Sequence, residues 1–582
     1  MKFPSRKPDR SVVVRAFWKR TLHRHVARSG PTSHLGRHLG APLALLALLL
    51  GCGESAGPHV PDAGPPCTGL TVCDGILVRA CNESARGEVL YDCLREGACS
   101  RGRCISPACA AAEVDRTSFA GCVFYTVQAD NVVSDAAAAT SCLVTNPGAE
   151  AAKVELQQSI EGGTWSAAPP VTVAPRSTAR LSFADLQVDK TGTNPRGALR
   201  ITSNRPVTVA QIESDDANHG ALSSAGTMLL PEHVLGNRYR VMTYPQAQTP
   251  AVAATAGGKS GAGRLLVVGT KAGTTVTMTL PKPSSVVIMG SLPSMLDDPL
   301  TFTLNEGEVF QALSGNEGDD LSGTEIRTTF PVAVFSGNIT TSYGRSLDNV
   351  SSPDMVHEQM PPLFAWSFKY VAAALPPQAA TCDTLLGQPG ASLWRVISAT
   401  DGTRVDVVGP SGPIRSGELL EPGQVMEFTS TEDLVVSGTG PLLMTQGIDC
   451  EPSLSLAISA DKLLKDLTFA VLPSFDQMAA IARKTGDPVM LDGVALDEKL
   501  FVSAGSGYQV ARVALPACQP SDEVCTHRLQ GRFGMTLRGM DVVASYALTA
   551  PAWAGCIDMM DPACLNSPPP RAARDRGYLK KH

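Results

Sequence analysis

The sequence predicts an all-β protein made of tandem β-sandwich-like repeats that follow a small disulfide-rich module. Short runs of alternating apolar and polar residues recur between residues 119 and 550, and turn-forming residues separate them. The chain holds 53 Gly and 43 Pro but only 5% aromatic residues, a composition that suits many short strands joined by turns. Similar elements also return at long intervals, as expected for repeated domains. A closed propeller-like β assembly is the alternative.

Residues 1–51 have the order of a secretory signal peptide. A long basic region with ten Lys and Arg against Asp9 precedes the apolar run at residues 41–50, which is shorter than the ~20 residues of a membrane-spanning helix. A start at Val26 or Leu35 would shorten the basic region. Leu49-Leu50-Gly51-Cys52 then resembles a lipobox, so we expect Cys52 to become the first mature residue and to carry lipid. Residues 52–66 are polar and rich in Gly and Pro, which predicts a flexible tether.

The charge of the chain argues against a nucleic-acid partner. The whole chain has a formal net charge of −6, from 49 Lys and Arg and 55 Asp and Glu. The segment up to Cys52 contributes +9, so the mature chain carries −15. Nucleic-acid binding favours the opposite sign.

Cysteine spacing predicts a disulfide-stabilised module at residues 67–109. Export brings the chain to a compartment where disulfides persist, and so short a stretch cannot bury a sufficient core without them. Six cysteines allow many pairings, and no C-x-x-C pair typical of zinc occurs among them. The disulfide candidates in this module are Cys67, Cys73, Cys81, Cys93, Cys99 and Cys104.

Further cysteines lie along the rest of the chain. Cys109, Cys122 and Cys142 straddle the boundary with the main body. Three later pairs are disulfide candidates because of their spacing: Cys382 with Cys450 inside the third repeat, and Cys518 with Cys525 and Cys556 with Cys564 across short loops.

Four units in the main body share the order of their elements. Each unit opens on an extended run, a tight turn and a second run, which predicts hairpins at residues 143–156, 265–278, 394–407 and 481–491. A longer apolar strand follows at residues 201–209, 326–334, 434–444 and 535–544, and we expect its proline, where present, near the strand start. The predicted units are residues 119–229, 230–358, 359–460 and 461–550, followed by a Cys-containing, Pro-rich and then basic tail at 551–582.

Motifs for catalysis are weak in this sequence. His357 and Glu358 are adjacent, but two further zinc ligands cannot be placed beside them. Acidic residues in glycine-containing loops make weak calcium candidates, namely Asp215, Asp216, Asp319 and Asp320. We therefore predict no catalytic residues, no defined metal site and no cofactor, and a protein that is not an enzyme.

Several short motifs carry a resemblance to a known family. They are the Gly121-Cys122-x-Phe124-Tyr125 start, the Asn146-Pro147-Gly148 turn, the Arg205-Pro206-Val207 and Phe330-Pro331-Val332-Ala333-Val334 strands, and the stretch at residues 357–362. Over roughly residues 67–550 the chain resembles the IgGFc-binding protein N-terminal domain family in a bacterial secreted form. The Cys-rich unit resembles a module that often precedes this domain in bacterial lipoproteins.

The resemblance and the lipobox together imply a function. We expect a lipid-anchored outer-membrane protein at the cell surface that acts in non-catalytic recognition or adhesion toward a protein or glycan ligand. The antibody binding that names the family is not carried over to this chain. A periplasm-facing structural scaffold is the alternative, and a secreted hydrolase with an unrecognised site is a third.

Overall fold

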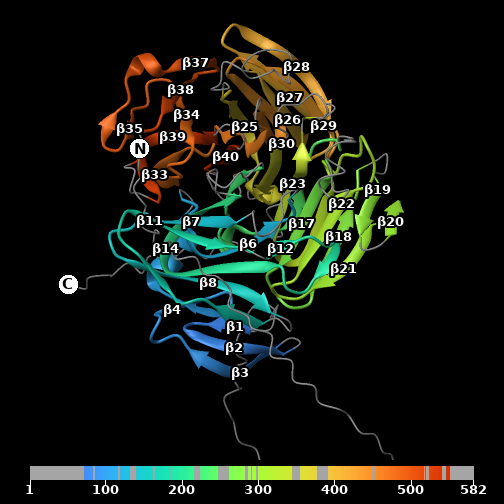
Figure 1. Ribbon diagram of the computed structural model, residues 1–582, viewed down its shortest axis with the longest axis vertical. Coiled ribbons are helices and arrows are strands. Elements are labelled where there is room, and N and C mark those ends of the chain that lie inside the picture. Colours follow the sequence, from blue (N-terminus) through green and yellow to red (C-terminus); the bar gives the residue numbers. More distant parts are fainter. Residues whose placement is uncertain are drawn as a thin grey trace, which may run out of the picture.

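The computed structural model describes most of the chain after residue 70. The described residues are 71–82, 85–115, 118–131, 139–160, 164–184, 186–214, 223–246, 261–281, 286–289, 292–295, 299–341, 343, 354–375, 391–448, 452–516, 518, 523–540 and 545–550. They are almost all β, as predicted, and a disulfide-rich region precedes four large sheets (Figure 1). Among these residues no helix is long and apolar enough to cross a membrane.

The disulfide-rich region is a small unit of two sheets and one helix. Its elements are β1 (Thr71–Asp74), β2 (Leu77–Asn82), β3 (Ala85–Asp92), β4 (Ala98–Ser100), β5 (Arg103–Ile105) and α1 (Pro107–Val114). Disulfides join Cys73 to Cys99 and Cys93 to Cys104 within the unit. Helix α1 begins with Ser106 as its N-cap, whose hydroxyl accepts the Cys109 N–H at 3.2 Å. A third disulfide, Cys109–Cys122, ties this helix to the first large sheet.

The first and second large sheets contain the strands between residues 121 and 359. The first is made of β6 (Gly121–Ala129), β7 (Thr140–Asn146), β8 (Ala152–Ile160), β9 (Thr164–Ala167), β10 (Val171–Val173), β11 (Ser177–Phe183), β12 (Gln187–Val188), β14 (Ala198–Glu213) and β15 (Ala225–Met228). The second is made of β13 (Gly192–Asn194), β16 (Gly236–Arg240), β17 (Gly263–Gly269), β18 (Thr274–Thr279), β19 (Val286–Met289), β20 (Leu292–Met295), β21 (Leu300–Leu304), β22 (Val309–Ser314), β23 (Glu325–Thr341) and β24 (Asp354–Gln359).

The third and fourth large sheets follow in the same manner. The third is made of β25 (Ser367–Ala372), β26 (Ser392–Ser398), β27 (Thr403–Gly409), β28 (Gly412–Leu420), β29 (Val425–Ser430), β30 (Leu434–Ile448), β31 (Ser453–Leu456) and β32 (Ile458–Ser459). The fourth is made of β33 (Leu464–Val471), β34 (Asp476–Lys484), β35 (Val489–Leu491), β36 (Val494–Ala495), β37 (Val502–Gly505), β38 (Tyr508–Ala514), β39 (Cys525–Met540) and β40 (Ser545–Thr549). Short 3-10 turns η2 (Glu232–Val234), η4 (Leu363–Ala365) and η5 (Glu498–Leu500) lie between strands.

One long strand belongs to both layers of each sandwich, namely β14, β23, β30 or β39. The first half of β14 pairs with β8 and its second half with β7. Pro206 lies between these halves, Pro331 divides β23 and Pro441 divides β30 in the same way. A proline has no N–H to donate, so it fits the corner where the strand leaves one ladder for the next. The prolines therefore mark the middle of these strands and not their start.

The predicted hairpins are wrong in their pairing, although their strands form. Strand β17 pairs with β22 and β23, whereas β18 pairs with β21 and β23. The same holds for β7 with β8, β26 with β27 and β34 with β35. The turn between the two strands crosses from one layer of the sandwich to the other. Glycines at three of the four turns take positive φ, namely Gly273 at 70°, Gly402 at 61° and Gly486 at 86°.

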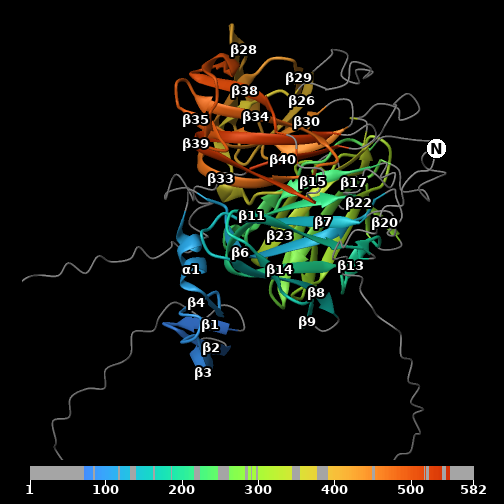
Figure 2. The ribbon, with the colours of Figure 1, turned by 60° about the vertical axis from the view of Figure 1, so that its left-hand side comes forward.

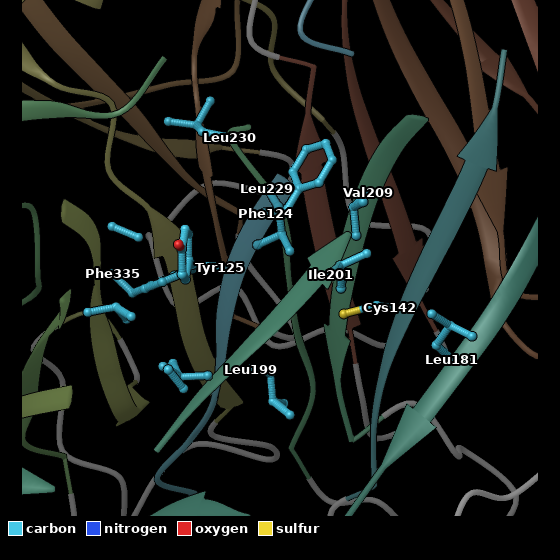
Figure 3. Packing of buried hydrophobic residues seen from close by; sticks show 14 of the residues in the cluster. Phe124, Tyr125, Cys142, Leu181, Leu199, Ile201, Val209, Leu229, Leu230 and Phe335 are labelled. Carbon is cyan, nitrogen blue, oxygen red and sulfur yellow. The ribbon is translucent and has the colours of Figure 1, made fainter. Parts of the chain in front are cut away.

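The cores of the sandwiches continue into their neighbours. Phe335 of the second sandwich packs with Phe124, Tyr125 and Leu199 of the first (Figure 3). Other clusters join the second sandwich to the third, the third to the fourth, and the fourth back to the first. Strands β15, β24, β31 and β40, one from each sandwich, contact one another where the four meet. Within the described residues the sheets nevertheless stay distinct and close into neither a barrel nor a propeller, so the propeller alternative is not supported.

Candidate functional site

A groove opens between two edge strands of the third sandwich. Strand β28 is the outer strand of one layer, and β29 is the outer strand of the other. The space between them has a volume of about 420 Å³. Its floor is apolar because two buried leucines line it, Leu434 of the core of the third sandwich and Leu393 of the cluster between the second and third sandwiches. Its walls carry Ile414, Arg415, Phe428 and Thr429, which offer apolar surface, charge and a hydroxyl within one site.

The outer edge of β29 forms one side of this groove. Among the described strands β29 pairs with β26 and with no other. Its counterpart in the second sandwich is β22. Strand β22 is the outer partner of β17, and β29 is the outer partner of β26, which holds the same place in the third sandwich. The outer edge of β22 is covered twice, by β13 at residues 309–311 and by β19 at residues 313–314. The matching backbone groups of β29 lack such a cover in the described structure.

The covering strand β13 comes from the neighbouring sandwich. Gly192, Thr193 and Asn194 precede β14 of the first sandwich, yet they pair antiparallel with Gln311, Phe310 and Val309. The Asn194 amide also donates to the Val309 carbonyl at 3.4 Å. A short extended segment from outside the sandwich is thus added to this edge within the molecule itself. An edge strand presents unpaired N–H and C=O groups that favour such additions.

The opposite wall, β28, is poorly suited to the same role. It begins with Gly412-Pro413, and its pairing with β27 shifts register twice. Proline, bulges and charges are the devices that protect an edge from strand addition. In the second sandwich the seam between the equivalent strands is closed by Phe302 stacked on Phe310, with ring centroids 3.9 Å apart. In the third sandwich Arg415 lies 5.6 Å from the Phe428 ring, and the seam stays open.

The charges of the groove are linked to the body of the protein. Glu427 on β29 forms an ion pair with Arg395 at 2.9 Å, and Arg395 also binds Asp320 of the second sandwich at 2.6 Å. The Arg395 guanidinium is buried, whereas the Glu427 side chain is 47% exposed. This arrangement fixes Glu427 at the rim and anchors the groove wall to the neighbouring sandwich.

A family match covers more than half of the chain. The model described as IgGFc binding protein matches residues 225–539, from β15 to the penultimate residue of β39. The chain belongs to the IgGFc-binding protein family. The match spans the second to fourth sandwiches and therefore includes the groove, and it starts later than the resemblance, which began near residue 67. The first sandwich repeats the same strand plan outside the matched range.

Other comparisons add little to the family assignment. No curated protein matches this chain. A GH78 family rhamnosidase of Bacillus sp. GL1 is among the matching solved structures, with 9% identity and a TM-score of 0.13. That match covers 60% of this chain and 56% of the rhamnosidase, so the chain spans just over half of the protein that it matches.

His357 and Glu358 of this family member do not form a joint site. They are consecutive in β24, so their side chains point to opposite faces of the strand. Arg264 donates from Nη2 to Nδ1 of His357 at 3.2 Å, and His357 stacks on Phe335. The Thr227 hydroxyl donates to Glu358 at 2.9 Å. Burial moves both groups toward neutrality, lowering the pKa of His357 well below its usual value and raising that of Glu358 well above it.

The calcium candidates are placed only in part. Asp215 and Asp216 lie outside the described residues. Asp319 accepts the Asn316 N–H at 2.7 Å, and Asp320 accepts donors on both carboxylate oxygens, from Thr243, Ser322 and Arg395. Burial alone would raise the pKa of Asp320, but Arg395 and Ser322 hold it below its usual value. Asp320 thus acts as the partner of a guanidinium, and the described residues contain no cluster of three metal-ligating side chains.

Six of the twelve predicted disulfide cysteines are bonded in the described structure. Cys73, Cys93, Cys99 and Cys104 are bonded within the Cys-rich unit, and Cys518 is bonded to Cys525. Cys81 lies in β2, and its side chain is outside the description. Cys52, Cys67, Cys382, Cys450, Cys556 and Cys564 lie outside the described residues, so their predicted roles stay predictions. Sequence reasoning missed the Cys109–Cys122 bond, which joins two predicted units.

The groove itself was also missed from the sequence. The alternation of Met426 and Phe428 with Glu427 and Thr429 indicates a strand with one buried face. Nothing in that pattern shows whether a further strand covers the edge. The only local signal is Gly412-Pro413, which is typical of an edge strand and lies on the opposite wall.

Proposed function

We propose that this family member is a lipid-anchored protein of the bacterial outer membrane that acts in non-catalytic recognition at the cell surface, and that the β28–β29 groove is its binding site. The lipobox at residues 49–52 supports export and anchoring, because the basic region, apolar run and cysteine follow in the order that acylation requires. Family membership supports a binding role.

The ligand that best fits the groove is an extended segment of another polypeptide. The observation that carries this proposal is the outer edge of β29, which no described strand covers, whereas the equivalent edge of β22 binds the added strand β13. Backbone hydrogen bonds to the edge would supply affinity. Alternate side chains of the ligand would enter the apolar floor at Leu393 and Leu434. Arg415 and Glu427 at the rim favour a ligand segment that carries both signs of charge.

Location is tested by protease shaving of intact cells with mass spectrometry of the released peptides. Release of peptides from residues 119–550 by unbroken cells is expected for a surface protein. Complete protection, with release only after the outer membrane is opened, would contradict surface recognition and favour the periplasm-facing scaffold. Acylation is checked separately by the mass of the N-terminal peptide that begins at Cys52.

The binding site is tested by selecting peptides from a displayed library of random unstructured sequences, with a glycan array probed in parallel. We expect enriched peptides whose binding is lost on Thr429→Lys and Ile414→Lys, since a lysine on the edge or wall blocks strand addition. The control is Thr172→Lys on β10, an exposed strand threonine of the first sandwich, which should bind normally. Glycan binding without peptide enrichment, or enrichment that ignores both groove variants, would overturn the assignment.

A further inference from the structure

The Cys-rich unit carries an exposed apolar surface at its far end. Both views of the molecule place β3 as the strand farthest from the four large sheets (Figures 1 and 2). Five large apolar side chains of β3 and of the turns beside β2 and β3 are exposed, and we call them the apolar tip: Ile76 (39%), Val89 (45%), Leu90 (44%), Tyr91 (48%) and Leu94 (71%). Clustered exposure of large apolar side chains on a soluble unit indicates a contact surface.

The geometry of the hairpin keeps these side chains outside the core of the unit. Val78 pairs with Tyr91 and Arg79 with Val89, so Leu90 lies in a bulge between two paired positions. The Cys93 N–H donates to the Ile76 carbonyl at 2.8 Å, which brings Ile76 beside the Cys93-Leu94 corner. Cys93 itself is buried and bonded to Cys104. Val78 and Cys93 thus fill the small interior of the unit, and the five residues of the apolar tip stay outside it.

The unit is fixed to the sandwiches at its other end. Arg103 donates to Glu232 at 3.3 Å, to Glu306 at 3.0 Å and to the Tyr125 hydroxyl at 3.3 Å. Glu306 also accepts Arg200 at 2.7 Å and the Trp165 indole N–H at 3.2 Å. With the Cys109–Cys122 disulfide, these contacts make the tip a rigid projection of the whole body.

The chain that precedes the tip limits what can lie against it. Eighteen residues separate Cys52 from Thr71, where β1 begins beside the tip. Even a fully extended chain of that length reaches only about 60 Å. A lipid on Cys52 would therefore keep the Cys-rich unit within about 60 Å of the bilayer. Strands β28 and β29, which line the groove, lie at the other end of the molecule from β3 (Figure 1).

We infer that the apolar tip inserts into the interface of the lipid bilayer that anchors the protein and so sets the orientation of the sandwiches. Leu94 is the most exposed of the five side chains, at 71%, and is therefore the one best suited to enter the interface. Residues 71–106 carry five Arg and five Asp or Glu, so the unit has no net charge. The contact is therefore apolar and does not require anionic lipid. This inference rests on the lipid anchor of the proposed function but not on its groove.

Insertion is tested with tryptophan quenching in the acylated protein. The Leu94→Trp variant is reconstituted into phosphatidylcholine vesicles that contain phospholipids with brominated acyl chains, and its emission is compared with that of the unsubstituted protein. The matched control is Val494→Trp on β36, because Val494 is 70% exposed and Leu94 is 71% exposed. We expect quenching of the added tryptophan at position 94 and none at 494. Equal quenching, or none at either position, would overturn the inference.

A second measurement distinguishes the contribution of the apolar tip to membrane binding from that of the lipid, and from peptide binding at the groove. The mature chain with Cys52→Ser, exported behind a cleavable signal peptide, is floated with phosphatidylcholine vesicles. We expect weak, salt-insensitive partitioning that falls about tenfold on Leu90→Glu with Leu94→Glu, and not on Val494→Glu. No partitioning, or a loss shared by the control, contradicts insertion. Peptide binding measured on the same samples reports on the groove alone, and the mass of the Cys52 peptide reports on acylation alone.

Discussion

At the residue scale, Arg538 is a buried charge without compensation. Its side chain is 1% exposed, on the face of β39 shared with Met478 and Ala547. None of its three guanidinium nitrogens has a hydrogen-bond partner in the described structure. Burial lowers its pKa to about 10, so it remains protonated at pH 7 and keeps the cost of desolvation.

Replacing Arg538 with an apolar residue should therefore stabilise the protein. We expect Arg538→Met to raise the free energy of unfolding by roughly 3 kcal/mol, which is the pKa change converted at 1.36 kcal/mol per unit. Urea denaturation at pH 7 measures it. Arg483→Met is the control, because Arg483 is equally buried but bonded to Glu498 and to the Asp487 carbonyl, and its loss should destabilise. Destabilisation by both variants would contradict the argument.

His233 is a second residue whose burial has a measurable effect. It lies in η2, where burial and then the Arg101 charge lower its pKa to about 4. The unfolded chain therefore binds a proton below pH 6.5 that the folded chain does not, so stability is full above pH 6.5 and falls as the pH drops toward 4. The difference between wild type and His233→Gln should change by up to about 3 kcal/mol over this window. If the difference in the free energy of unfolding between the two proteins did not change with pH, that would contradict the lowered pKa of His233.

At the element scale, a buried tyrosine holds the corner of the long strand in two of the sandwiches. The Tyr239 hydroxyl donates to the Val332 carbonyl at 2.6 Å and accepts the Gly236 N–H at 2.8 Å. Tyr370 does the same in the third sandwich, with the Leu442 carbonyl at 2.6 Å and the Ser367 N–H at 3.2 Å. Both carbonyls belong to the residue after the corner proline.

Removing either hydroxyl should weaken the corner without changing the packing of the ring. Tyr239→Phe and Tyr370→Phe each leave a buried carbonyl and a buried N–H without their partner, which costs roughly 1–3 kcal/mol. Thermal unfolding of each variant measures the loss. Tyr91→Phe is the control, because Tyr91 is 48% exposed and its bond to the Gly102 carbonyl is 3.4 Å long. Unchanged stability of both corner variants would show that the hydroxyl is dispensable there.

The elements also show what the sequence can and cannot predict. Strand positions follow from alternation, which is why segments such as 265–268 and 275–278 fall inside β17 and β18. Their pairing could not be predicted, because a short glycine turn suits a hairpin or a crossing between layers. The long strand β23, about fifty residues later, decides between them. The groove depends on segments still more distant in the sequence, since among the described strands none covers the edge of β29 as β13 covers that of β22.

At the scale of the whole molecule, the four sandwiches depend on one another. Their apolar clusters cross every boundary, and β13 leaves the first sandwich to join the second. Where they meet, the contacts are polar as well as apolar. Asp354, at the start of β24, is fully buried and accepts the Ser224 N–H at 2.7 Å, the Met355 N–H at 2.8 Å and the Ser545 N–H at 3.1 Å. Ser545 in turn bonds to Ser453 of the third sandwich.

Because this one carboxylate reaches three sandwiches directly and the fourth through Ser545, its loss should be felt across the molecule. Asp354→Ala leaves the buried N–H groups of Ser224 and Ser545 without their acceptor, whereas the Met355 N–H keeps the Ser223 hydroxyl at 2.8 Å. We expect a cost of about 2 kcal/mol or more. Hydrogen exchange should rise in β15 and β40 as well as in β24, and Asp401→Ala on an exposed turn should change none of them. Faster exchange confined to β24 would show that the sandwiches hold together through their apolar clusters alone. Faster exchange in all three strands would show that the buried carboxylate couples them.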